Sequence, residues 1–172
     1  MILKGWRIGI LFSVMLVLVG CSVTEEEALE LGRQAYIVSI EEETEQSNVE
    51  MDEVQIFLPR GFEVIEEQEY NILLQQDDQL FVLFHQPSEP PTSTIRLKED
   101  MESAGTAIIY EVRETDELVS YLIVEEGEEE GLLLVKTAVG GAKISTLSTY
   151  KRLENDISAM TQIVHSYQAN IE

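Results

Sequence analysis

The order of apolar and polar residues predicts where the strands of this chain lie. From Asp52 onward, apolar residues often recur at every second position, as in Val54, Ile56 and Leu58. This period of two is typical of strands that bury one face. We therefore expect strands within residues 54–58, 62–64, 70–74, 80–84, 107–112, 118–124, 132–139 and 142–147.

One of these segments, residues 80–84 (LFVLF), is apolar at every position and not only at alternate ones. A short run of this kind predicts a central strand that is covered on both faces. Residues 86–93 (QPSEPPTS), which follow almost at once, hold three of the 4 prolines of the chain. Proline cannot donate a ladder hydrogen bond, so this segment is expected to be a loop.

Two other segments have helical spacing. Residues 24–40 begin with Thr24-Glu25-Glu26-Glu27, which matches a capping box, and apolar residues follow at helical intervals. This helix either docks on the rest of the domain or acts as a spacer.

The acidic and poorly patterned residues 41–50 are interpreted as a linker, and residues 95–103 fit either a short helix or irregular structure.

The end of the chain predicts a second amphipathic helix with one apolar stripe. Its apolar residues stand three or four positions apart: Leu153, Ile157, Met160, Val164 and Tyr167. The last four strands are joined by short connections, which favours antiparallel neighbours. The expected fold class is α+β, an antiparallel sheet with the C-terminal helix packed on one face and the other helix near the N-terminus.

The first residues predict an export signal and a lipid anchor. Lys4 and Arg7 precede an uncharged, mainly apolar run, residues 8–20, which is shorter than the roughly 20 residues that a membrane-spanning helix needs. The run ends in Leu18-Val19-Gly20-Cys21, which resembles the lipobox of bacterial lipoproteins. This resemblance implies that the Cys21 sulfur receives a diacylglyceryl group and that the peptide before it is removed. Cys21 is therefore the predicted lipidation site.

The anchor sets the expected organisation and location. Residues 1–20 are the predicted signal peptide, residues 21–50 the lipidated N-terminus with its helix and linker, and residues 51–172 a single α+β domain. Two acyl chains anchor a protein stably, whereas one is marginal. We expect a protein on the extracytoplasmic face of the cell membrane, held there by the lipid on Cys21. Cys21 is the only cysteine, so no disulfide can form within the chain.

The charge of the chain limits its partners. Removing residues 1–20 takes away two of the 11 basic residues and none of the 33 acidic ones, which leaves a formal charge of −24. Nucleic-acid binding requires clustered Lys and Arg, so no nucleic-acid partner is expected. Basic partners and divalent cations stay compatible with this charge. The wide spread of the acids also fits an ordinary solvated surface.

Few residues suggest catalytic or metal chemistry. Ser148-Thr149-Tyr150-Lys151 matches the Ser-x-x-Lys pattern of penicillin-recognising enzymes, but the companion motifs are missing, so a helix start capped by Ser or Thr is expected instead. The two histidines, His85 and His165, lie far apart in the sequence without a metal-ligand spacing. We expect His85 at a strand end and His165 on the exposed or flanking side of the helix.

The most acidic stretch, residues 125–131 (EEGEEEG), is interpreted as a solvated hairpin tip, with a calcium site as the alternative. The acid pairs Glu66-Glu67 and Asp77-Asp78 fit the carboxylates of a hydrolase, but acids are too numerous here for adjacency to be informative. No phosphate loop or dinucleotide motif appears in the sequence. No catalytic residue, no metal site and no cofactor is therefore predicted.

Longer stretches resemble known proteins. The runs FLPRGFEV, NILLQQDDQLFVLF and MTQIVHSY are similar to small Gram-positive lipoproteins of unknown function. The order of strands followed by a final helix is similar to the Mog1/PsbP-like fold. These resemblances imply a structural likeness and supply no active site.

The leading hypothesis is therefore a non-enzymatic binding or interaction module, tethered to the membrane and facing an envelope protein partner. Its working surface is expected in the loop at residues 86–93 or on a sheet face that no helix covers. The alternatives are a cell-envelope hydrolase or accessory factor, and a small-ligand carrier with an apolar pocket between helix and sheet.

Overall fold

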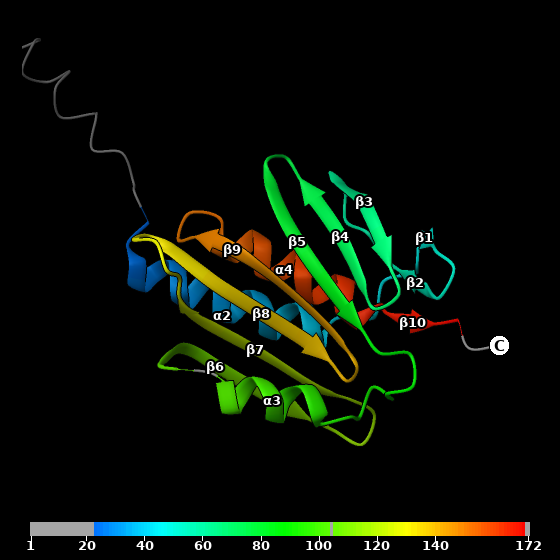
Figure 1. Cartoon of the computed structure of the whole chain (residues 1–172). Coiled ribbons are helices and arrows are strands. Elements are labelled where there is room, and N and C mark those ends of the chain that lie inside the picture. Colours follow the sequence, from blue (N-terminus) through cyan, green and yellow to red (C-terminus); the bar gives the residue numbers. More distant parts are fainter. Residues whose placement is uncertain (1–22, 104, 171–172) are drawn as a thin grey trace, which may run out of the picture.

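The computed structural model describes residues 23–103 and 105–170 (Figure 1). Its helices are α2 (Glu25–Glu41), α3 (Ile95–Ser103) and α4 (Leu153–His165). Its strands are β1 (Val49–Glu50), β2 (Val54–Ile56), β3 (Phe62–Gln68), β4 (Asn71–Gln76), β5 (Gln79–His85), β6 (Ala107–Glu114), β7 (Val119–Glu126), β8 (Leu132–Val139), β9 (Ala142–Thr149) and β10 (Gln168–Ala169). In the described residues, no helix is long and apolar enough to cross a membrane.

Seven strands form one antiparallel sheet in the order β3-β4-β5-β9-β8-β7-β6. The short strands β1, β2 and β10 form a second, three-stranded antiparallel sheet. Each strand that the period of two predicted is present, and residues 95–103 form a helix. The expected α+β class, with an N-terminal and a C-terminal helix, is confirmed.

Helices α2 and α4 lie on the same side of the seven-stranded sheet, which we call the inner face (Figure 1). The predicted apolar stripe of α4 is buried there, because Leu153, Ile157, Met160 and Val164 are at most 1% exposed. Opposite them, the strands contribute buried residues such as Val135 to one continuous core. This burial supplies the main stabilisation of the fold.

The structure also shows that α2 docks on the domain. Its N-cap is Thr24, whose hydroxyl accepts a hydrogen bond from the Glu27 amide over 3.2 Å, as the capping box predicted. A Cβ at Gly32 would come within 2.9 Å of the Ile157 side chain, so α2 and α4 pack closely. Near the end of α2, the buried Tyr36 hydroxyl lies 2.8 Å from that of Ser120.

The prediction that residues 80–84 form a strand covered on both faces is wrong in one respect. The strand β5 is central, between β4 and β9, and Phe81 and Leu83 are fully buried on the inner face. On the other face, which we call the outer face, Leu80 is 52% and Val82 is 42% exposed. The reason is that α3 lies on the outer face mainly over β6 and β7 (Figure 1). Its Arg96 reaches Phe84 near the end of β5, but α3 does not cover Leu80 and Val82.

The proline-rich segment is a loop, as predicted, and it is fixed against the β8–β9 turn. The Gln86 amide donates to the Gly141 carbonyl over 3.0 Å, and the Val119 amide donates to the Pro91 carbonyl over 2.9 Å. Gly140 has a φ of 53°, and a Cβ there would lie 2.4 Å from the Pro90 carbonyl oxygen. Only glycine permits both this backbone conformation and this close approach.

Candidate functional site

The register of the strands arranges the outward side chains of the outer face in rows. In one row, Val82 of β5 lies opposite Leu73 of β4 and Ser145 of β9. In the next row, Leu147 of β9 lies opposite Leu134 of β8 and, by the same register, beside Leu80 of β5. Neighbouring side chains in such rows touch one another across strands.

These rows form an exposed apolar surface, which we call the open face and define as Leu73, Leu80, Val82, Leu134 and Leu147. Leu147 is 52% exposed, as Leu80 is, and Leu73 and Leu134 are partly buried. Single exposed apolar residues are ordinary, but a contiguous group on rigid strands is the usual signature of an interaction surface. The open face is therefore the main candidate site.

Acidic residues border the open face at one end. The β4–β5 turn with Asp77 and Asp78 and the β7–β8 hairpin, residues 127–131, lie at the same end of the sheet, because β5 and β8 both start there. The acids of both turns, together with Glu126 at the end of β7, are exposed: Asp77, Asp78, Glu126, Glu128, Glu129 and Glu130. The open face is thus an apolar surface beside a strongly negative rim, which favours a partner that carries positive charge.

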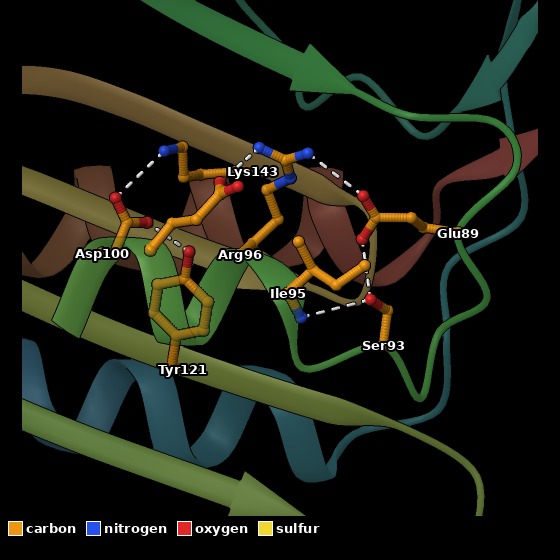
Figure 2. A network of polar contacts seen from close by, with 8 residues as sticks. Glu89, Ser93, Ile95, Arg96, Asp100, Tyr121 and Lys143 are labelled. Carbon is orange, nitrogen blue, oxygen red and sulfur yellow. Dashed lines mark hydrogen bonds and ion pairs between the residues drawn. The ribbon is translucent and has the colours of Figure 1, made fainter. Parts of the chain in front are cut away.

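A network of polar contacts holds α3 on the outer face (Figure 2). The buried carboxylate of Asp100 accepts a hydrogen bond from the Tyr121 hydroxyl and lies 3.1 Å from the Lys143 ammonium. Burial, and to a lesser extent the neighbouring Asp100 carboxylate, raises the pKa of Tyr121 far above its ordinary value. Tyr121 stays protonated and serves as a hydrogen-bond donor.

Arg96 connects the same helix to the proline-rich loop. Its guanidinium lies 3.1 Å from the Glu89 carboxylate (Figure 2). It also lies 2.6 Å from the Glu99 carboxylate and stacks over the Phe84 ring at 4.6 Å. The Ser93 hydroxyl donates to Glu89 over 2.7 Å. Each carboxylate in this network has a basic or hydroxyl partner, so the network fixes α3 and the loop along the border of the open face.

The two histidines lie on different elements. His85 ends β5, as predicted, and is 1% exposed, whereas His165 lies partly buried near the end of α4, with its Nε2 3.1 Å from the Thr44 hydroxyl. Burial lowers the pKa of both imidazoles. Within residues 23–103 and 105–170, no three His, Cys, Asp or Glu side chains are grouped so that they could hold a metal ion.

The structure does not bring Ser148 and Lys151 together as a catalytic pair. Ser148 is buried at the end of β9 and its hydroxyl donates to the Asp156 carboxylate over 2.6 Å, while Lys151 is exposed. The expected Ser or Thr cap is wrong, because Arg152 is the N-cap of α4 and makes no side-chain capping bond. The buried Asp156, which also accepts from Gln79 over 2.8 Å, ties this end of the helix to the sheet instead.

The acidic stretch at residues 125–131 forms the end of β7 and the turn into β8. Glu125 points back onto the sheet, where its carboxylate lies 2.7 Å from the Lys136 ammonium. Glu66 and Glu67 are exposed on the edge strand β3. The predicted lipidation site, Cys21, lies outside the described residues.

The sequence analysis predicted that the working surface could lie on a sheet face that no helix covers, but it did not identify the residues of that face. The signal was present in residues 80–84, since a strand that is apolar on both faces exposes one apolar row wherever no second layer covers it. Asp100 and Asp156, which are buried acids in the part of the chain that the structure describes, could not be distinguished among 33 acidic residues.

Comparisons with known proteins add a structural neighbour. No family model matches the chain, and no curated protein is significantly similar to it. Among solved structures, the chain is similar to cyanobacterial PsbP (CyanoP) from Synechocystis sp. PCC 6803, with 14% sequence identity and a TM-score of 0.41. The match covers 73% of this chain and 97% of that one.

Proposed function

We propose that this protein is a lipid-anchored extracytoplasmic module that binds a protein partner through the open face and performs no catalysis. The partner presents apolar side chains flanked by lysine or arginine. The single observation that carries the proposal is the apolar group of Leu80, Val82 and Leu147 in two neighbouring rows, about half exposed on the strands beside an acidic rim.

Two physical effects support such a partner. Fully burying a valine or leucine contributes roughly 1.5–3 kcal/mol, and since Leu80, Val82 and Leu147 are already about half buried, covering all three contributes roughly 2–5 kcal/mol. The acids at the rim attract a basic partner and accelerate its association, while they repel a second copy of this acidic chain. Charge complementarity therefore selects a basic partner rather than self-association.

The anchor rests on the lipobox Leu18-Val19-Gly20-Cys21. The anchor would keep the domain close to partners at the membrane, and the open face would bind the partner. Mass analysis of the mature protein tests it, because a diacylglyceryl group on an N-terminal Cys21 is expected. In detergent partitioning, Cys21→Ser should move from the detergent phase to the aqueous phase. An intact leader with an unmodified thiol would overturn the anchor.

A photo-crosslinking amino acid at position 82 tests the open face in cells that make the full-length chain. A protein with a basic, apolar surface should be captured from position 82 and not from Val38, a 50% exposed valine on α2 that serves as the matched control. Equal capture from both positions, or none from either, would contradict the proposed face.

The cell-envelope hydrolase stays the alternative. Turnover of envelope fragments by the purified full-length protein in detergent, lost in a variant of an acidic residue, would favour that alternative over the binding module.

A further inference from the structure

The strands beneath the open face offer a partner no free backbone edge. The open face lies on β4, β5, β9 and β8, and each of these strands is paired along both of its edges. A segment that covers apolar side chains removes water from its own backbone, whose amides and carbonyls must then find other partners. An extended strand laid on this face would find none, whereas an α-helix pairs its backbone groups internally.

A helix of this chain covers the other part of the same face. Helix α3 lies on the outer face mainly over β6 and β7, where its Leu97 packs with Tyr121 and Ile123 (Figure 1). Sheets are commonly covered by helices that bury one apolar stripe. A second helix, supplied by the partner and lying beside α3, would extend this layer over the open face.

The width of the open face matches a short helix. Leu73 on β4 and Leu134 on β8 are separated by three steps in the strand order. At roughly 4.8 Å per strand and about 1.5 Å of rise per helical residue, this width corresponds to about ten residues, or roughly three helical turns. Such a helix presents its apolar residues at positions i, i+3, i+4 and i+7.

Acidic residues flank the open face on a second side, along the edge strand β3. Glu66 of β3 lies opposite Leu73, and Glu63 lies opposite Gln75, which is the partner of Leu80. Cross-strand partners share a face, so both glutamates continue the rows of the open face, and both are exposed. The open face is therefore bordered by acids at the end of the sheet and along β3.

The basic residues near the open face do not cancel these acids. On the side of α3, Arg96, Lys136 and Lys143 are each paired with a carboxylate of this chain. Arg60 precedes β3 and Lys151 follows β9, so both lie at the end of the acidic rim, where the acids outnumber them. A helix with lysine or arginine on both sides of its apolar stripe is attracted to this surface, and one with glutamate there is repelled.

We propose that the segment of the partner that binds the open face is an amphipathic α-helix of about three turns, with basic residues on both sides of its apolar stripe. The helix lies beside α3 and covers Leu80, Val82 and Leu147. This inference rests on the proposed function and specifies the binding segment of the partner.

Three synthetic peptides of about 14 residues test the helix, with the full-length protein in phosphatidylcholine nanodiscs. The first has leucines at helical spacing with lysines on both sides, the second has the same residues in strict alternation, and the third has glutamate in place of each lysine of the first. Each peptide carries a dye, and fluorescence anisotropy measures binding after subtraction of empty nanodiscs. The first should bind with a Kd of about 1 mM or tighter, and the others at least about ten-fold more weakly.

Variants locate the bound peptide. Val82→Asp should weaken the helical basic peptide about ten-fold or more, whereas Val38→Asp on α2, also at an exposed valine, should leave it unchanged. Glu63→Gln combined with Glu66→Gln should weaken it about three-fold or more. The matched control changes two exposed glutamates outside the open face, Glu43→Gln with Glu45→Gln, and should have no effect.

The helix is overturned if no peptide binds, if the alternating or the glutamate peptide binds as tightly as the first, or if the Val82 or the Glu63 and Glu66 variants bind it like the wild type. If photo-crosslinking at position 82 nevertheless captures a basic, apolar partner, the proposed function stands and only the helix is wrong. If position 82 captures no partner, both are overturned.

Discussion

The contact between the β8–β9 turn and the proline-rich loop gives the sharpest test of the fold, through Gly140→Ala. Gly140 has a φ of 53°, and an added Cβ would lie 2.4 Å from the Pro90 carbonyl oxygen and 2.5 Å from the Pro91 Cα. Both are backbone atoms and cannot rotate away. Gly131 is a matched control, because its φ is 82° and nothing lies within 4 Å of its added Cβ.

The difference between the two variants isolates the loop contact. A left-handed backbone costs a non-glycine residue about 1–2 kcal/mol, and Gly131→Ala should lose only this amount. Gly140→Ala must also displace the loop, which strains or breaks the hydrogen bonds from Val119 to Pro91 and from Gln86 to Gly141. At about 0.5–1.5 kcal/mol each, these bonds add roughly 1–3 kcal/mol, so the total loss is about 2–5 kcal/mol.

Urea unfolding of both variants and the wild type measures the free energies directly. For a domain of this size, each kcal/mol also lowers Tm by about 2–4 °C. Losses that are equal in Gly140→Ala and Gly131→Ala would refute the reasoning, because they would mean that the loop does not lie against the turn.

Three further predictions concern the buried polar groups. Asp156→Ala removes the acceptor of the Gln79 amide and the Ser148 hydroxyl, so the free energy of unfolding in urea should fall by about 3 kcal/mol. The control is Glu154→Ala at an exposed position, which should change this free energy by less than about 0.5 kcal/mol. Asp100→Ala leaves Tyr121 and Lys143 without their shared acceptor, and hydrogen exchange of the α3 amides should become at least about ten-fold faster; unchanged exchange would contradict the anchoring role of the network. Burial lowers the pKa of His85 in the folded state, so the unfolded chain binds more protons below about pH 6.5 and stability falls as pH falls through that range. His85→Gln should therefore lose less stability than the wild type between about pH 7.5 and pH 5.5, and an equal loss would contradict the assigned pKa direction.

Periodicity predicted the elements because each depends on nearby residues. The strands between 107 and 147, the final helix and the proline-rich loop all follow from local spacing and turn residues. The start of α2 follows in the same way, from one side-chain bond between Thr24 and the Glu27 amide.

The contacts across the fold could not be predicted in this way. Whether the outward apolar residues of β5 are covered depends on where α3 lies. The position of α3 is set by the contacts of the Asp100 carboxylate with the Tyr121 hydroxyl and the Lys143 ammonium. Nothing local in the sequence joins these positions.

Ser148 shows that a short motif does not fix the role of a residue. The sequence analysis set aside a catalytic Ser-x-x-Lys pair and expected a helix cap, whereas the strand places the serine against Asp156 and leaves Lys151 in solvent. Asp100 and Asp156 carry structural roles that their residue type alone does not indicate, since 33 acids share the chain.

The most direct test of the central claim is the dissociation constant of the partner captured from position 82, measured with wild-type protein, Val82→Asp and Val38→Asp. Val82→Asp should weaken binding about ten-fold or more, because a charge replaces an apolar contact, and Val38→Asp should bind as the wild type does. Binding should also weaken as salt is raised, because the rim is acidic. If both variants bind like the wild type, the open face is not the binding surface.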